Sequence, residues 1–599
     1  MGDIYGANNY TIGNNLLGAG NLQVRLPLDL SFRSQLGITL ENGYQTVYQD
    51  PRLSEVARQL GGIGSYYTSE AFRYIWDNTL TFDRKIGKHS IDIIAGTSAS
   101  KQQDHSSAQS GYGFPSYSVR VLSAASTYTL NQTFADAWTL ESFFERLNYS
   151  YDGKYLFSAS LRRDGSSRLG IRNQWANFPA FSAGWRASQE NFLSDLSWLS
   201  DLKLRTGWGA TGNLPADLYP SYSLLNGGNN YAFNGTNPVT GTVPSGQAGN
   251  PSLLWEETWQ FNTGLDIALL NNRLSLSADY YIKRTHNLIL NVPQPQSTGV
   301  STKEENMPGY VQNKGFEFLL SADLFRGKGF KWTSSLNMSF NKNIVSLPAG
   351  TSPILTGYIQ DIGGNAGIVK SGLPLGSFWG YINDGVNPQT GNINFRDLNK
   401  DGRIDPDNDR TFIGSALPRF TFGFSNMFSY HGLDLNILID GVYGNKIFDA
   451  TRMETEDMTD MINQTTRVLH RWRKPGDVTD IPKAMYGSGA PVGSVPNYSI
   501  SSRWVESGSF LRFRQITLAY NLNKKWISAA GLYGLRLYVT LQNMFIFTGY
   551  KGYSPELNVA TTSNVVSAGT TANLATQQGF DHGTYPQARS VTFGLTISL

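Results

Sequence analysis

Hydrophobic and polar residues alternate with a period of two along most of the chain. Residues 272–286, 329–343 and 532–547 show the pattern clearly. Successive side chains of a β-strand point to opposite faces, so each such segment has one apolar face and one polar face. The pattern therefore predicts an all-β protein.

The length of these segments distinguishes a membrane protein from a soluble one. About sixteen segments alternate in this way: 28–42, 71–84, 88–102, 138–151, 154–165, 176–188, 199–211, 255–269, 272–286, 310–325, 329–343, 417–430, 432–443, 508–522, 532–547 and 587–599. Many exceed the roughly five or six residues of a typical soluble strand. A tilted membrane strand needs about 9–11 residues. Their length favours a transmembrane antiparallel β-barrel.

The connections between the segments alternate between short and long. The short ones lie at 84–89, 151–154, 269–272, 325–329 and 430–432. The long ones lie at 103–137, 212–254, 287–309, 344–416, 444–507 and 548–586. Outer-membrane barrels combine short periplasmic turns with long extracellular loops. With the C-terminus in the periplasm, every long connection is expected outside the cell.

The first residues of the chain lack a clear strand pattern. We expect residues 1–27 to form a loop or an irregular segment, and residues 28–599 to form the barrel. Residues 1–6 also lack the basic and apolar regions of a secretory signal peptide. We therefore expect the chain to begin inside a longer gene product.

Composition narrows the class of protein further. Charged residues make up 16% of the chain, below the roughly 25% of soluble domains. Aromatic residues reach 13%, which suits the aromatic girdles of a barrel but also a large sugar-binding β protein. A net charge of +3 is too small to suggest a nucleic-acid partner. The chain has no cysteine, which excludes a disulfide scaffold.

One motif resembles the front of an EF-hand-type calcium loop. The candidate ligands all offer oxygen atoms: Asp397, Asn399, Asp401, Arg403 through its carbonyl, Asp405 and Asp409. Gly402 stands at the sharp turn of the motif, whereas the final position holds Asn408 instead of glutamate. A structural calcium ion is the cofactor that this spacing suggests. The alternative is a turn rich in Asx residues, without metal.

No pattern in the chain indicates an enzyme. The 6 histidines are scattered without paired metal spacing, and no nucleophile elbow or phosphate-binding glycine loop is present. We predict a protein that is not an enzyme. Several loop aromatics are candidates either for stacking on sugar rings or for packing within the loops: Trp255, Tyr310, Phe378, Trp379 and Tyr381.

Longer motifs give a family resemblance. They include LRTGWGATGN at 204–213, NPSLLWE at 250–256, YYIKRT at 280–285, NKGFE at 313–317 and DLNKDGRID at 397–405. RW at 471–472, TDIP at 479–482, GFD at 579–581 and YP at 585–586 extend the series, and 591–599 is similar to a barrel-assembly signal. Together these stretches resemble the SusC/RagA-like TonB-dependent transporters of Bacteroidetes outer membranes.

The resemblance implies a location, a mechanism and partners. Such transporters have about 22 strands and a plugged lumen, so the chain is expected to be a C-terminal barrel portion without the plug and about six strands. The implied partners are outer-membrane lipid, a SusD-like surface lipoprotein, a glycan or peptide substrate, and the TonB complex through the missing N-terminal part. The implied function is nutrient import across the bacterial outer membrane.

Two other functions fit parts of the pattern. A complete diffusion porin with sixteen strands would need no plug. A secreted β protein that binds polysaccharide would show the same alternation, but with its apolar faces buried. Exposure or burial of the apolar faces therefore distinguishes the secreted protein from the two membrane proteins.

Overall fold

The computed structural model describes residues 8–53, 55–231, 239–327, 329–359, 364–459, 462–486, 495–528, 531–557 and 578–598. Their main feature is a sheet of 17 strands. The strands are β1 (Asn8–Leu26), β2 (Leu30–Gln49), β3 (Ile63–Ile86), β4 (His89–Tyr112), β5 (Thr127–Tyr151), β6 (Tyr155–Ser166), β7 (Trp175–Arg186), β8 (Leu199–Asn213), β12 (Glu256–Leu269), β13 (Leu274–His286), β16 (Tyr310–Arg326), β17 (Phe330–Ser346), β24 (Phe420–Tyr430), β25 (Leu433–Tyr443), β28 (Phe510–Asn521), β29 (Gly534–Thr548) and β31 (Ser590–Ser598).

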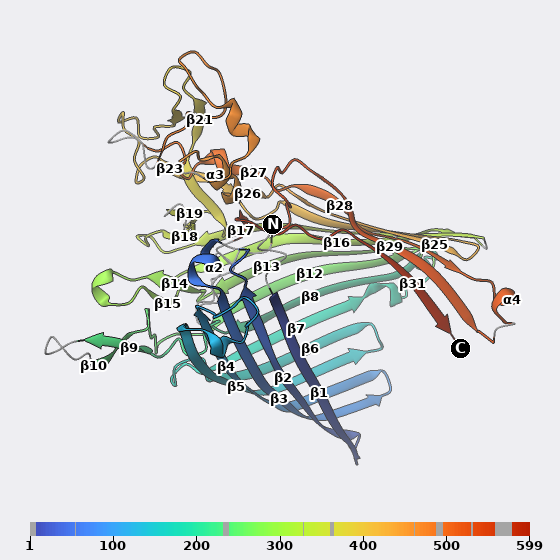
Figure 1. Cartoon of the computed structure of the whole chain (residues 1–599). Coiled ribbons are helices and arrows are strands. Elements are labelled where there is room, and N and C mark those ends of the chain that lie inside the picture. The colour runs from blue at the N-terminus through green and yellow to red at the C-terminus, as the bar shows by residue number, and fades with distance from the viewer. Residues whose placement is uncertain are drawn as a thin grey trace. The chain divides into compact units, whose positions relative to one another are not determined.

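The chain divides into two compact units. Unit 1 comprises Met1–Ala183, Gly209–Glu256 and Pro293–Asn306, and unit 2 comprises Gly184–Trp208, Glu257–Val292 and Met307–Leu599. In unit 1, strands β1 to β6 pair antiparallel in chain order (Figure 1). In unit 2, the strands from β12 to β31 pair in the same manner. Neighbours in sequence are therefore neighbours in the sheet.

Each predicted segment overlaps one strand of the sheet, and β1 is the additional strand. The expectation of a loop or irregular segment over residues 1–27 is wrong where β1 lies, because Asn8–Leu26 pairs with β2 along its whole length. Its glycine- and asparagine-rich sequence has little intrinsic preference for a strand. Pairing with a neighbouring strand overrides such weak local preferences.

Short turns and long connections alternate along most of the sheet, but the connections 187–198 and 522–533, at the turn ends, are longer than predicted. The turn between β5 and β6 contains Asp152 and Gly153 with φ values of 54° and 69°. Positive φ at both central residues is what a tight type I′ hairpin turn requires. The long connections contain α2 (Glu55–Leu60), β9 (Leu225–Tyr231), β10 (Val239–Pro244), β11 (Gln247–Ala248), β14 (Ile289–Pro293) and β15 (Thr302–Asn306).

Unit 2 has the largest loops. They hold β18 (Ile354–Ile359), β19 (Gly364–Val369), β20 (Ser377–Tyr381), β21 (Asn383–Val386), β22 (Ile393–Phe395), β23 (Arg410–Ser415), β26 (Lys446–Asp449), α3 (Ala450–Glu456), β27 (Val505–Ser507) and β30 (Phe580–Asp581). In Figure 1, β19, β21, β23, α3, β26 and β27 lie together, far from α4 (Lys524–Ile527), which belongs to a connection at the opposite strand ends. We call all of these unit 2 loop elements, together with η6 (Ser502–Trp504), the loop assembly.

Many large apolar side chains of the sheet are exposed, whereas the apolar core of the loop assembly is buried. Leu22, Leu36 and Phe593 are 60%, 41% and 81% exposed on their strands. Phe448 and Trp504, in the loop assembly, are 0% and 1% exposed. Such extensive apolar exposure requires a nonaqueous neighbour, so the secreted, water-soluble alternative is wrong. Among the described residues, no helix has the length and apolar character needed to cross a membrane.

Candidate functional site

The polar face of the unit 2 sheet contains linked charges. Arg205 on β8 lies 3.0 Å from Asp266 on β12 and 2.6 Å from Asp279 on β13. Ser277 accepts a further hydrogen bond from the same guanidinium at 3.0 Å. The two aspartates alternate along their strands with apolar residues, so they lie on the opposite face of the sheet from those apolar side chains. Arg205 therefore connects three neighbouring strands on the polar face.

A second ionic group lies on β25 and β28. Arg512 and Arg514 approach Asp440 at 2.8 Å and 3.0 Å, and both contact Glu556. Burial raises the pKa of Glu556, but the hydrogen bond and charge of Arg512, together with Arg514, lower it overall. Arg512 is 2% exposed. The group therefore joins the sheet to the connection between β29 and β31, and its acids compensate the buried charge of Arg512.

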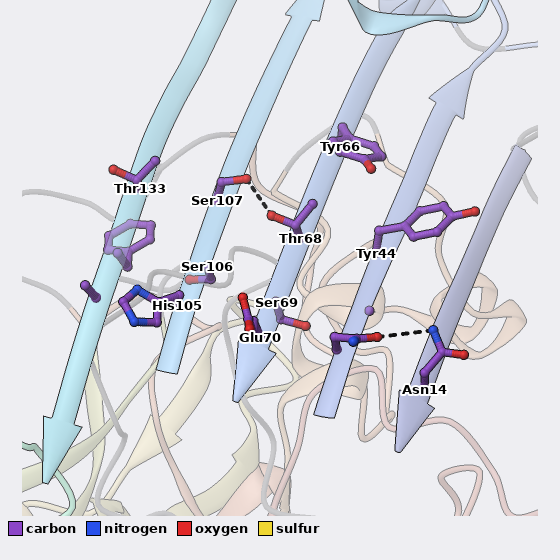
Figure 2. A pocket seen from close by; sticks show the side chains of 14 residues that line it. Asn14, Tyr44, Tyr66, Thr68, Ser69, Glu70, His105, Ser106, Ser107 and Thr133 are labelled. Carbon is purple, nitrogen blue, oxygen red and sulfur yellow. Dashed lines mark hydrogen bonds between the residues drawn. The ribbon is translucent and has the colours of Figure 1, made fainter. Parts of the chain in front are cut away.

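In unit 1, a hollow of about 610 Å³ lies on strands β1 to β5 (Figure 2). Asn14 donates a hydrogen bond to Asn42 at 3.1 Å, and the hydroxyl oxygens of Thr68 and Ser107 are hydrogen-bonded at 2.7 Å. The side chains that line it are mainly hydroxyl, amide and aromatic groups. This hollow could not be predicted from the sequence, because its residues come together only through the strand register.

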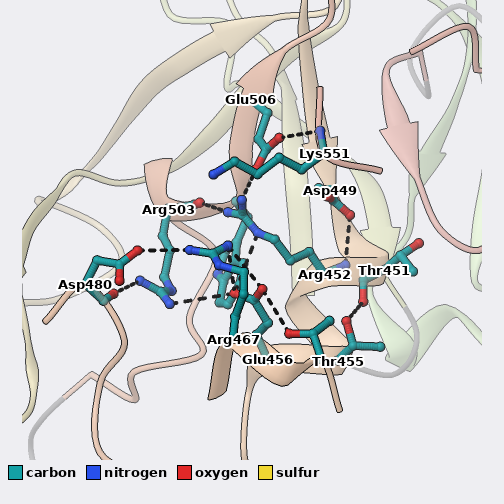
Figure 3. Close-up of polar contacts among 12 residues, drawn as sticks. Asp449, Thr451, Arg452, Thr455, Glu456, Arg467, Asp480, Arg503, Glu506 and Lys551 are labelled. Atoms are coloured by element: carbon teal, nitrogen blue, oxygen red, sulfur yellow. Dashed lines mark hydrogen bonds and ion pairs between the residues drawn. The ribbon is translucent and has the colours of Figure 1, made fainter. Parts of the chain in front are cut away.

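The loop assembly of unit 2 is built around a buried glutamate (Figure 3). Glu456, at the end of α3, is 3% exposed. Arg467 lies 3.2 Å away, and Arg452 and Arg503 each lie 3.9 Å away. Arg452 also contacts Glu506. Burial, followed by the charge of Arg452, lowers the pKa of Arg503 to about 10, so Arg503 remains charged at neutral pH.

A group of buried acids stands next to this glutamate. Asp449 is 2% exposed and accepts a hydrogen bond from the backbone N–H of Arg452 at 2.8 Å, which caps α3. Burial raises the pKa of Asp449 to about 6. The Tyr550 hydroxyl donates to the Asp581 carboxylate, and burial raises the pKa of Tyr550. These contacts connect α3 with two other loop segments.

Unit 1 has an acid pair in its outer loops. Burial and the nearby Asp217 raise the pKa of Glu304 to about 7. Asp217 accepts a hydrogen bond from Gln247 at 3.0 Å, and Asn250 donates to the Glu304 carbonyl at 2.8 Å. Glu304 is 4% exposed, and burial beside another carboxylate favours its protonated form. The pair ties together segments on both sides of β11.

The candidate calcium loop is closed by its own hydrogen bonds. The Asp397 carboxylate accepts from the backbone of Lys400 and Gly402 at 2.6 Å and 2.8 Å. Asn399 donates to Asp401 at 2.8 Å, and Asp401 accepts from the Arg403 backbone, also at 2.8 Å. These carboxylates act as Asx-turn acceptors. In the described parts of the chain, no group of three or more His, Cys, Asp or Glu side chains is placed to hold a metal ion.

The end of the same loop is fixed by Asp409. This residue is 0% exposed, and its carboxylate accepts from the backbone of Leu398 at 2.7 Å and of Asp405 at 2.9 Å. Hydrogen bonds from the Asn408 side chain and backbone lower the pKa of Asp405. The predicted residues are thus brought together in one folded turn, in which Asp409 has a structural role.

Several motifs from the sequence belong to the packing of the loops. Phe580 packs against Phe378 and Phe448, with ring centroids 5.1 Å and 5.7 Å apart. Trp255 donates to the Gln174 carbonyl at 2.9 Å and is 6% exposed. Of the two roles considered for the loop aromatics, packing is therefore the correct one for Phe378 and Trp255. Sequence reasoning did not identify the buried ionic network, although its residues adjoin these motifs.

Comparison with known proteins extends over most of the chain. The family model described as TonB dependent receptor-like, beta-barrel matches residues 2–544. TonB-dependent receptor P3 of Formosa agariphila is 31% identical over 590 residues, covering 95% of this chain and 56% of that protein. TonB-dependent receptor SusC of Bacteroides thetaiotaomicron is 29% identical, covering 95% of this chain and 54% of that protein. The chain spans about half the length of these curated relatives.

The fold is also found in a solved structure. The RagAB peptide transporter structure matches with a TM-score of 0.83 at 24% identity, covering 99% of this chain and 62% of that one. The family match favours a transporter over the diffusion porin. Since the apolar strand faces are exposed and the loops are unequal at the two strand ends, the structure agrees with an outer-membrane location. The chain belongs to the family of TonB-dependent receptor-like β-barrels.

Proposed function

We propose that the chain forms the barrel part of an importer that brings an oligosaccharide or peptide nutrient across the outer membrane. A SusD-like lipoprotein would contact its outer loops, and the TonB complex would supply energy to the full-length protein. The barrel portion itself would have no catalytic role. Its polar face would line the path of the nutrient.

The observation that carries this proposal is the construction of the loop assembly. Its core contains Phe378, Phe448, Trp504 and Phe580, which come from three different connections of the sheet. Glu456 and its arginines add buried ion pairs. A packed core with compensated charges makes a rigid surface. Rigid surfaces favour docking of a protein partner, because little conformational entropy is lost on binding.

The choice of an oligomeric, polar substrate rests on the polar strand face. This face contains ion pairs such as Arg205 with Asp266 and Asp279, and an amide pair at 2.9 Å between Asn341 and Asn313. Such groups exchange hydrogen bonds with hydroxyls and peptide groups. The RagAB protein is described as a peptide transporter, which makes a peptide one of the two substrate classes to test.

Cross-linking tests the partner. Affinity-tagged full-length protein is treated in intact cells with an amine-reactive cross-linker. Lys400 and Lys474 are exposed on the outer loops of unit 2, and Lys331 is exposed beside a short turn. We expect a lipid-modified protein to cross-link through Lys400 or Lys474 and not through Lys331. Equal cross-linking of all three lysines, or none, would contradict a partner on the outer loops.

Growth on defined nutrients tests the transport. A strain that lacks the gene is compared with one complemented by the full-length gene, on glycan oligomers, on peptides and on monomers of each. We expect loss of growth on one oligomer class alone, restored by complementation. Normal growth on every oligomer would contradict an import function.

Calcium binding by the 397–409 loop also remains a prediction. In this structure the carboxylates of Asp397 and Asp401 accept hydrogen bonds from backbone N–H groups, and a bound ion would compete with those N–H groups for the carboxylate oxygens. We expect a chelator to expose this loop to protease in the full-length protein. An unchanged cleavage pattern would argue for a metal-free Asx-rich turn.

A further inference from the structure

The hollow on strands β1 to β5 lies on the face of the sheet that also holds exposed apolar residues. On β2, Leu36 and Leu40 have the same orientation as Asn42 and Tyr44, because all four have even numbers. Leu36 and Leu40 are 41% and 38% exposed. The hollow therefore opens on the lipid-facing side of unit 1, opposite its polar face.

On β2 and β3, this face changes from apolar to polar residues at one level of the register. Leu40 pairs with Phe72, the next pair on the same face is Asn42 with Glu70, and the one after is Tyr44 with Thr68. On β4, His105 stands opposite Glu70. Residues advance about 3.4 Å along an antiparallel strand. The hollow therefore begins directly above the apolar stretch, at the depth of the lipid headgroups.

The composition of the hollow indicates what it can bind. Figure 2 shows Tyr44 and Tyr66 on adjacent strands, and their ring centroids are 5.9 Å apart. Hydroxyl, amide and carboxylate groups of Thr68, Asn42 and Glu70 surround the rings. Aromatic rings pack against the C–H faces of sugars, while such polar groups exchange hydrogen bonds with sugar hydroxyls.

The charged residues of the hollow indicate whether it suits a sugar or a phosphate group. Its lining contains one carboxylate, Glu70, and one histidine, His105, but no lysine or arginine. Phosphate sites need arginine or lysine side chains or converging backbone N–H groups. In these strands the backbone N–H groups are used in strand pairing. The hollow is therefore suited to uncharged sugar rings.

We propose that this hollow binds the sugar headgroup of an outer-leaflet glycolipid. The sugar rings lie over Tyr44 and Tyr66, and the acyl chains run beside Leu40 and Phe72 below them. The hollow adjoins the apolar stretch of the same face. We therefore favour a glycolipid over a free nutrient sugar, because only a glycolipid contacts the hollow with its sugar and the apolar stretch with its acyl chains. The hollow volume of about 610 Å³ is within the usual range for a small-molecule site.

The test uses full-length protein in vesicles. One set contains lipooligosaccharide with phosphatidylethanolamine, and the other contains phosphatidylethanolamine alone. Tightly bound lipid is counted by native mass spectrometry and Tm is measured in both sets. We expect retained lipooligosaccharide and a higher Tm in the first set, because a ligand that binds the folded state stabilises it. Equal Tm values and no retained glycolipid would overturn the proposal.

A pair of adjacent residues supplies the matched control. Tyr66 and Tyr67 lie on opposite faces of β3. We expect Tyr66→Ala to weaken glycolipid binding by about tenfold and Tyr67→Ala to leave it unchanged. Glu70→Gln keeps the shape of the site and removes its carboxylate acceptors, so it should also weaken binding without affecting folding. Equal effects of Tyr66→Ala and Tyr67→Ala would contradict the site.

Competition decides the source of the sugar. The oligosaccharide released from the same lipid is added to the vesicles at a concentration equal to that of the glycolipid. We expect it to displace little of the bound glycolipid, because it lacks the acyl chains. Displacement at equal concentration would overturn the glycolipid assignment and indicate a site for free sugars.

Discussion

The sheet and the loop assembly use their hydrophobic residues in opposite ways. On the strands, large apolar side chains such as Leu36 and Phe593 are exposed, and backbone pairing holds the structure together. In the loop assembly, Phe448 and Trp504 are buried among other aromatics, and buried ions reinforce the packing. Lipid is the solvent of one region and water that of the other. The same side chain therefore has opposite effects in the two places.

The largest expected effect comes from removing a buried ring of the loop assembly. Trp504→Ala leaves a cavity where the ring packs at 1% exposure, which costs roughly 3–5 kcal/mol. We expect faster hydrogen exchange and protease cleavage in the outer loops of the full-length protein, with the sheet intact. Trp526→Ala is the control, because Trp526 is 67% exposed. Equal effects of the two changes would show that the loops lack a packed core.

Removing the buried carboxylate should have a similar or slightly smaller effect. Glu456→Gln leaves three arginines without their shared partner, and breaking a buried ion pair costs about 3–5 kcal/mol. The control is Asp384→Asn, which removes an exposed pair with Arg396 at 2.6 Å and should cost about 1 kcal/mol or less. Loop opening is followed by hydrogen exchange. A neutral Glu456→Gln variant would mean that the network contributes no stability.

A charge on the apolar strand face tests the other side of the comparison. Leu36→Arg is expected to destabilise the protein in lipid by about 2–4 kcal/mol, because the charge meets hydrocarbon. Gln35→Arg, on the opposite face of β2, should have little effect. Urea unfolding of the full-length protein in vesicles measures both. The comparison would fail if the two substitutions were equally tolerated.

The smallest expected effect is a pH dependence in the loop assembly. The pKa of Asp449 is raised to about 6 in the folded protein, so the folded state binds this proton more tightly than the unfolded state. Its contribution to stability is complete below the unfolded value of about 4 and is lost as pH rises through 6. The loss is at most about 3 kcal/mol.

Asp449→Asn isolates this contribution. Asparagine keeps the helix cap but cannot ionise. We therefore expect the variant to gain stability relative to the original protein between pH 4 and pH 7, measured by hydrogen exchange of α3. A stability difference independent of pH would show that Asp449 does not titrate in this range.

Most of the sheet could be predicted from the sequence, because strand alternation is a local property. Each predicted segment corresponds to a strand, and only β1 was missed, since its glycines and asparagines hide the pattern. The loop core could not be predicted in the same way. Phe378, Phe448, Trp504 and Phe580 come from distant segments and follow no common period.

The candidate sites show the same limit. An Asx-rich turn was one of the two interpretations of the residues from Asp397 to Asp409. The backbone N–H groups that donate hydrogen bonds to the Asp397 and Asp409 carboxylates are visible only in the structure. The hollow depends on register across five strands, so Tyr44 and Tyr66 appear unrelated in the sequence. Local patterns thus predict elements and turns, whereas sites formed by distant segments require the fold.

The most direct test is to measure the surroundings of adjacent residues on one strand. The chain has no cysteine, so single cysteines at positions 30–40 of the full-length protein can each carry a spin label. Accessibility to oxygen, which partitions into lipid, is compared with accessibility to a water-soluble nickel chelate. We predict oxygen accessibility at Leu36 and Leu40 and chelate accessibility at Gln35 and Thr39. Equal access of the chelate to all four positions would contradict a sheet with one face in lipid.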